Sequence, residues 1–120
     1  MRTFGLMKKL LKGFGYAFKG VAYAARTQLN FRVHLVAMLI AIGLGLYLHI
    51  STAEWCWIVA GIAAVLITEL LNTAIEILVD LVSPGYNEKA GHIKDVSAAA
   101  VLITAVFAAI IGAIIFIPKF

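Results

Sequence analysis

Four polar side chains recur along an otherwise apolar stretch of the sequence, and three of them are acids. The members of this polar stripe, which lie three, four and four residues apart, are Glu69, Asn72, Glu76 and Asp80. On an α-helix this spacing places all four within a sector of about 80°. A carboxylate at the centre of a bilayer costs roughly 2.5–3.5 kcal/mol, so it persists where a cation, a cavity or a partner helix stabilises it. The polar stripe is therefore a candidate functional site.

The composition indicates that the chain lies in a membrane. Of its 120 residues, 63% are hydrophobic and 13% are charged, whereas soluble domains are about 45–50% apolar. Three apolar segments, residues 31–48, 55–82 and 96–117, each reach the roughly 17–25 residues that a helix needs to cross the hydrocarbon core. We predict one membrane-embedded domain over residues 1–120, an all-α membrane protein with three transmembrane helices.

The basic residues are distributed unevenly. Nine of the ten Lys and Arg residues lie before or at the start of the first apolar segment, or in the loop before the third. By the positive-inside rule, the N-terminus and this second loop are cytoplasmic, while the first loop and the C-terminus face outward. We predict a multi-pass protein in this orientation.

Residues 1–29 differ from the apolar segments. Leu10, Phe14 and Phe18 recur at helical spacing, with lysines between them, which predicts an amphipathic helix on the cytoplasmic surface. The competing interpretation is a secretory signal peptide, but Lys12 and Lys19 interrupt its apolar region and no cleavage signal is apparent.

The loops give further expectations. Residues 83–91 are rich in helix breakers and predict a turn, after which Lys94 and Asp95 open the third helix with Asp95 as a candidate N-cap. His34, His49 and His92 have no ligand spacing to one another, so we interpret them as interfacial or loop residues. The single cysteine, Cys56, fits no zinc spacing and is interpreted as a packing or membrane-facing residue.

The depth of the polar stripe bears on its chemistry. If the second apolar helix enters the membrane at Trp55 from outside, Glu69 lies about 21 Å deep and Glu76 near the inner boundary. This depth favours chemistry on a lipid head group over ion conduction, although an ion-binding site stays open. The sequence has neither a G-x-x-x-x-G-K-[ST] loop nor a protein-kinase signature, so its motifs alone do not establish nucleotide binding.

The stripe and its surroundings resemble the prokaryotic diacylglycerol kinase family, which includes the undecaprenol kinases. The matching residues are Glu69-x-x-Asn72-Thr73-Ala74-Ile75-Glu76-x-x-Val79-Asp80, Lys94-Asp95 with Ala98 to Ala100, Gly15-Tyr16-x-x-Lys19-Gly20, and Tyr86. The Asn30-x-Arg32-x-His34 segment looks more like the undecaprenol-kinase branch. The likeness covers nearly the whole chain.

The resemblance implies a bacterial inner-membrane lipid kinase that works as a homotrimer, with active sites between subunits. It implies that the chain transfers phosphate from ATP, with Mg²⁺, to the hydroxyl of a membrane lipid alcohol, and it implies no nucleic-acid partner. Glu69 would be the catalytic base and would also contact the lipid, together with Arg32 and Ala98. Glu76 and Gln28 would bind the metal. The residues that would contact ATP are Lys9, Tyr16, Asn72, Asp80, Tyr86, Asn87, Lys94 and Asp95.

Two positions depart from the family pattern. Gln28 stands where most members have a second metal-binding carboxylate, and Asn87 stands where a histidine commonly follows the loop tyrosine. A glutamine oxygen can ligate Mg²⁺ but adds no charge to the site.

These departures leave two other functions open. One is a catalytically weak family member that binds lipid or nucleotide, and the other is a small ion-coupled transporter subunit, suggested only by the intramembrane acids. The sequence does not distinguish diacylglycerol from undecaprenol, because both chains require only an apolar groove.

Overall fold

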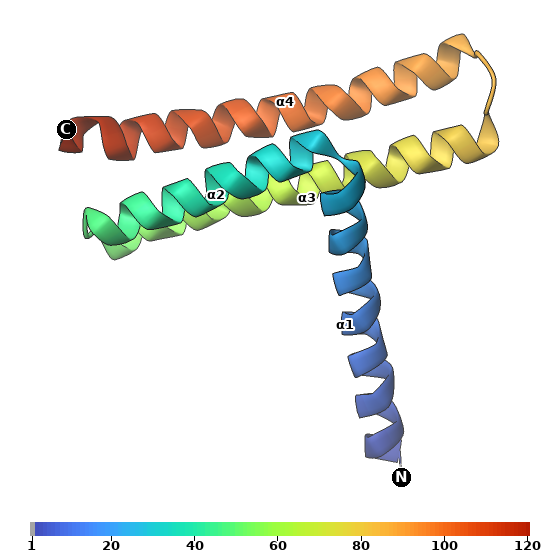
Figure 1. Cartoon of the computed structure of the whole chain (residues 1–120), viewed down its shortest axis with the longest axis horizontal. Helices are drawn as coiled ribbons and strands as arrows, with labels where there is room; N and C mark the ends of the chain where they lie inside the picture. The colour runs from blue at the N-terminus through green and yellow to red at the C-terminus, as the bar shows by residue number, and fades with distance from the viewer. Residues whose placement is uncertain (1) are drawn as a thin grey trace.

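Residues 2–120 are described by a computed structural model, and over that range the chain is helical with short connections. The elements are α1 (Arg2–Thr27), α2 (Leu29–Tyr47), α3 (Thr52–Val82), α4 (Glu88–Phe116) and the 3₁₀ turn η1 (Ile117–Lys119). Helices α2, α3 and α4 form a bundle, in which α3 packs against both α2 and α4. Helix α1 leaves the start of α2 and points away from the bundle (Figure 1).

Three of the helices are long and apolar enough to cross a membrane. They are Leu29–Tyr47, Thr52–Val82 and Glu88–Lys119, the last including η1, which confirms the predicted number of spanning helices. The 31 residues of α3 extend for about 46 Å at 1.5 Å per residue, well beyond a hydrocarbon core of about 30 Å. Part of α3 therefore extends beyond the apolar core of a bilayer.

The start of α3 is set by a capping box rather than by the tryptophans. The Ser51 hydroxyl accepts a hydrogen bond from the Glu54 backbone N–H at 3.1 Å, and the Glu54 carboxylate accepts one from the Ser51 N–H at 2.9 Å. These two bonds satisfy N–H groups that a helix start otherwise leaves unpaired. The helix consequently begins at Thr52, three residues before the predicted Trp55.

The expectation that Asp95 caps the last helix is wrong. Helix α4 begins at Glu88, because the Asn87 side-chain oxygen accepts hydrogen bonds from the backbone N–H groups of Lys89 at 3.0 Å and Ala90 at 3.2 Å. Asparagine is among the strongest N-cap residues, and one glycine inside a helix is tolerated at about 1 kcal/mol. Gly91 and Asp95 therefore lie within α4, and the connection is shorter than residues 83–91.

The bundle is tightly closed at the end that carries the α2–α3 turn and the C-terminus, which we call the closed end. Its apolar cluster consists of Ile50, Ile58, Ile111, Ile115 and Phe116. At the same end, the Lys119 ammonium lies 3.0 Å from a Glu54 carboxylate oxygen. The C-terminal segment is thus joined to the start of α3 by both apolar packing and an ion pair.

Along the bundle, α3 and α4 approach closely. The hydroxyl groups of Thr68 and Thr104 are hydrogen-bonded at 2.8 Å. Two helical turns along α3 toward the closed end, a Cβ placed on Gly61 would lie 3.5 Å from Ala108, which is ordinary contact. Small residues and hydroxyl pairs of this kind bring membrane helices together, and here they fix the register of α3 against α4.

Gly45 offers a test of packing at the closed end. A Cβ on Gly45 would lie 2.7 Å from the Trp55 ring, whereas nothing lies within 4 Å of one on Gly43. Both substitutions gain the helix propensity of alanine, so their difference reports the clash. Relative to Gly43→Ala, we expect Gly45→Ala to lower the free energy of unfolding by about 1–3 kcal/mol. Thermal unfolding of the two variants in the same detergent measures this, and equal midpoints would show that Trp55 moves aside at little cost.

Candidate active site

Glu69 is the most deeply buried acid of the polar stripe. Glu69 is 2% exposed, and it lies on the face of α3 that meets α2. There, its Oε1 atom lies 3.3 Å from Nε2 of His34, without hydrogen-bonding geometry, so that Oε1 has no hydrogen-bond partner among residues 2–120. An unpaired buried carboxyl oxygen is costly. Such an atom is available for a substrate hydroxyl.

Asn72 and Glu76 form the next part of the stripe. The Asn72 amide nitrogen donates a hydrogen bond to Glu76 Oε1 at 3.2 Å, while its own oxygen is buried and unpaired within the described residues. One carboxylate and one free amide oxygen, one turn apart, are the hard oxygen donors that Mg²⁺ takes. No group of three His, Cys, Asp or Glu side chains suited to a metal occurs in residues 2–120. The pair therefore fits Mg²⁺ if phosphate oxygens and waters complete its shell.

The last acid of the stripe reaches the neighbouring helix. The Lys94 ammonium on α4 lies 2.6 Å from Asp80 Oδ1, and the two side chains are 40% and 65% exposed. An ion pair this exposed contributes little stability. It does place a fixed positive charge beside the stripe, two turns inside α4.

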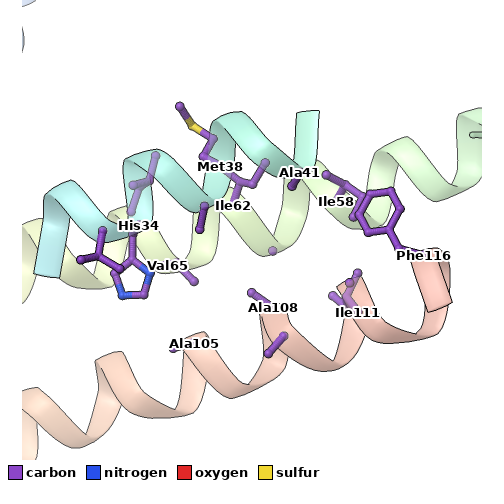
Figure 2. Close-up of a pocket in the computed structure, with 16 residues that line it drawn as sticks. His34, Met38, Ala41, Ile58, Ile62, Val65, Ala105, Ala108, Ile111 and Phe116 are labelled. Atoms are coloured by element: carbon purple, nitrogen blue, oxygen red, sulfur yellow. The ribbon is translucent and has the colours of Figure 1, made fainter. Parts of the chain in front are cut away.

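An apolar groove runs from the Glu69 contact toward the closed end. It has a volume of about 340 Å³ and lies among α2, α3 and α4. His34 and Val65 lie at one end and Phe116 at the other, as Figure 2 shows. The α4 wall includes small side chains such as Ala105 and Ala108, and the larger Ile111 and Phe116 lie toward the closed end. The groove therefore offers a hydrocarbon chain an apolar surface that ends at His34, the side chain in contact with the buried Glu69 carboxyl group.

A second cavity, of about 510 Å³, lies between α3 and α4 on the Asn72 side. Thr68, His92 and Ser97 contribute its polar atoms. Asn72 also lines this cavity, which is large enough for another group.

Other predicted site residues are not brought to the stripe within one chain. Tyr16, on α1, is 68% exposed, and the Lys19 ammonium lies 5.7 Å from the centre of its ring. Tyr86 is 98% exposed in the α3–α4 loop, and Asp95 and Ala98 lie on exposed positions of α4. Lys9 is also exposed, on the part of α1 that points away from the bundle. A single chain therefore assembles only part of the predicted site.

The junction of α1 and α2 holds two more of these residues. Gln28 is the one residue between the helices and has an extended backbone. The Arg32 guanidinium donates hydrogen bonds to the carbonyl groups of Ala25 at 2.9 Å and Arg26 at 3.0 Å. It thereby pairs carbonyls that the end of α1 would leave free, next to the negative end of the helix dipole. Arg32 fixes the junction, and with it the place of Gln28.

Comparisons with known proteins show the family to which the chain belongs. Residues 15–116 match the sequence profile of the family described as prokaryotic diacylglycerol kinase. The chain belongs to the prokaryotic diacylglycerol kinase family. It is 38% identical over 113 residues to the undecaprenol kinase of Bacillus subtilis, covering 94% of this chain and 92% of that protein.

Two further family relatives are named diacylglycerol kinase. The protein of Escherichia coli is 34% identical over 102 residues, which are 85% of this chain and 84% of that protein. The protein of Synechocystis is 41% identical over 110 residues, 91% of this chain, but the match spans only 63% of that longer relative. The resemblance drawn from the polar stripe is thus confirmed, and the chain is a member of a lipid-kinase family.

Within this diacylglycerol kinase family member, sequence reasoning missed His34. It was expected at an interface or in a loop, yet it lies inside α2 and faces Glu69. The polar stripe could be found because it repeats along one helix. The partner of Glu69 depends on how α2 is rotated against α3, for which the sequence carries no signal.

Proposed function

We propose that this protein transfers the γ-phosphate of Mg·ATP to the hydroxyl group of a membrane lipid alcohol, either a diacylglycerol or a polyprenol, at the cytoplasmic face of the inner membrane. The observation that carries the proposal is the buried, unpaired carboxyl oxygen of Glu69 beside an apolar groove. Membership of a family whose named members phosphorylate lipid alcohols supports the same reaction.

In this proposal Glu69 is the base. A lipid whose chain lies along the groove would bring its hydroxyl to the groove end beside Glu69, where the carboxylate orients the hydroxyl and takes its proton. Phosphoryl transfer depends mainly on positioning and on charges that stabilise the transferred oxygens. Lys94 supplies one such positive charge, and Asp80 holds its ammonium until a phosphate group competes for it.

Glu76 and Asn72 would hold Mg²⁺ against the phosphates, with Gln28 as a neutral third ligand. The bound ion supplies charge neutralisation at the phosphate oxygens. Asn72 contributes in two ways, since its amide nitrogen orients Glu76 and its oxygen is free to ligate.

We further propose that the active form is a homotrimer. Helix α1 extends away from its own bundle, so Lys9, Tyr16 and Gln28 would complete the site of a neighbouring subunit while the apolar side of α1 lies on the membrane surface. Three helices alone enclose too little surface for both a lipid and a nucleotide. This arrangement keeps the N-terminus cytoplasmic and the C-terminus outside.

The direct test uses detergent-solubilised full-length protein with labelled ATP and Mg²⁺. Diacylglycerol and undecaprenol are supplied in separate reactions, and the labelled lipid is extracted and counted. We expect Mg²⁺-dependent label in at least one lipid. Label in neither lipid, with ATP binding retained, would support the catalytically weak alternative.

Position 28 gives a prediction specific to this chain. A negative charge within a few Å of the metal site strengthens Mg²⁺ binding. A gain of about 1.4 kcal/mol in binding free energy corresponds to about tenfold in affinity. We expect Gln28→Glu to lower the half-saturating Mg²⁺ concentration by about this factor, with the two proteins converging at saturating Mg²⁺. Initial rates against free Mg²⁺ measure the effect. Superimposed curves would place Gln28 outside the metal shell, and activation of an otherwise inactive protein would favour the weak-enzyme alternative.

A further inference from the structure

The contact between His34 and Glu69 has no role in the reaction as described so far. His34 Nε2 lies 3.3 Å from Glu69 Oε1, and the two side chains are 24% and 3% exposed. Within residues 2–120, the Glu69 carboxyl group makes an ion-pair contact with His34 and no side-chain hydrogen bond. His34 is therefore positioned between a buried acid and a more open space.

On the side of the groove, the surroundings of the pair are otherwise apolar. On α3, Val65 lies one turn before Glu69, and on α4 the groove wall next to His34 carries alanines such as Ala105. The nearest other acid on the stripe, Glu76, lies two turns further along α3 and accepts a hydrogen bond from the Asn72 amide. No titratable side chain of α4 lines this groove in the described part of the chain. A proton on Glu69 consequently has His34 as its polar route outward.

Turnover requires such a route. As the lipid oxygen forms its bond to the γ-phosphorus and the bond from phosphorus to ADP breaks, the hydroxyl proton passes to the Glu69 carboxylate. Before the next lipid can react, Glu69 must lose that proton, and a carboxyl group this buried does not exchange it readily with bulk water. A neutral imidazole can accept a proton at one nitrogen and release one to water, which suits histidine to proton transfer.

We propose that His34 is a positioning residue that orients the Glu69 carboxyl group and carries its proton to water, resetting the base between turnovers. The inference rests on the proposed function, in which Glu69 accepts the hydroxyl proton. One proton leaves the lipid, passes through Glu69 and His34, and enters water, while phosphate moves from ATP to the lipid oxygen. No other reactant is needed.

The test separates the first turnover from later ones. His34→Gln keeps an N–H donor of similar reach but cannot carry a proton, and His34→Ala removes both properties. His49→Asn, in the exposed α2–α3 turn at a positive φ of 52°, is the matched control, since asparagine tolerates that backbone. Each full-length protein is assayed in detergent with saturating Mg·ATP and a lipid alcohol that the wild type phosphorylates. The assays use enzyme excess for the first turnover and lipid excess for kcat, and circular dichroism confirms helicity.

In His34→Gln we expect a first turnover close to wild type and a kcat lower by about tenfold to hundredfold. This loss is smaller than most of the 100- to 10,000-fold range for an acid or base that acts on the substrate, because His34 acts only on Glu69. In His34→Ala, added imidazole should raise kcat severalfold, whereas the wild type and His49→Asn should not respond. A purely structural role would not produce rescue by imidazole.

Unchanged kcat in both His34 variants would overturn the inference, as would equal losses in first turnover and kcat without a response to imidazole. Either result, with active wild type and inactive Glu69→Gln, leaves the proposed function standing. A wild type that phosphorylates no lipid alcohol is the separate result that overturns the proposed function, and the relay with it. If His34→Ala fails to fold, His34→Gln still tests the inference, because the inference requires kcat to fall more than the rate of the first turnover.

Discussion

Glu69→Gln is expected to lower kcat by about 100- to 10,000-fold, the range that a positioned general base contributes, while Mg·ATP binding stays close to wild type. The reason is location, because the Glu69 carboxyl group is buried against α2, whereas the Asn72–Glu76 pair lies further along α3. Glutamine keeps the volume of glutamate, so the packing around residue 69 changes little. Phosphorylation rates and equilibrium nucleotide binding in detergent measure the two effects.

Glu76→Gln is the contrasting variant. Mutating a residue that only hydrogen-bonds to a metal ligand commonly lowers metal affinity by about 10- to 100-fold. Losing a direct ligand should therefore weaken Mg·ATP binding by at least about tenfold. Glu88→Gln, an exposed acid in the first turn of α4, is the matched control and should change neither quantity. Equal losses of nucleotide affinity in the Glu69 and Glu76 variants would contradict the assignment of Glu69 as the base and Glu76 as the metal ligand.

Mixing two inactive variants is expected to restore activity from nearly none. One variant carries Glu69→Gln with Glu76→Gln, which removes the base and weakens the metal site on α3, and the other carries Lys9→Ala with Tyr16→Ala on α1. In a closed ring of three subunits with sites at their interfaces, random 1:1 mixing leaves about a quarter of the sites undamaged. We therefore expect about a quarter of wild-type activity, provided that the detergent allows subunits to exchange.

Separately tagged chains give the control for this experiment. Copurification of the two tags shows that hybrid assemblies have formed, and unmixed variants processed in the same way set the background. Hybrids that form but recover no activity would place each site within one subunit. In that case α1 would have to fold back toward its own polar stripe, contrary to the direction seen in Figure 1.

Features local to one helix could be predicted from the sequence. The three spanning helices follow from length and hydropathy, and the stripe from Glu69 to Asp80 follows from periodicity. The errors at helix starts had readable signals, since Ser51 and Glu54 have the spacing of a capping box and Asn87 precedes an acidic first turn. Tryptophan positions and glycine content were less reliable guides than these caps.

Features that depend on how helices are placed against one another could not be predicted. The contact between His34 and Glu69, the ion pair between Asp80 and Lys94, and the groove are set by rotations and crossings of whole helices. The direction of α1 follows from the extended backbone of one residue, Gln28, and from the bonds made by Arg32. The residue types glutamine and arginine do not by themselves predict a change of direction between two helices.

The closed end gives the bundle a gradient of local stability. Apolar packing around Ile58 and Ile115, the Gly45–Trp55 approach and the Glu54–Lys119 pair all lie there, whereas the opposite half contains unpaired buried oxygens of Glu69 and Asn72. Local opening takes the least free energy where buried contacts are fewest. Amide hydrogens near Glu69 should therefore exchange faster than those around Ile58 and Ile115. The three helices can separate briefly near Glu69 to admit a lipid from the side while they stay packed together at the closed end.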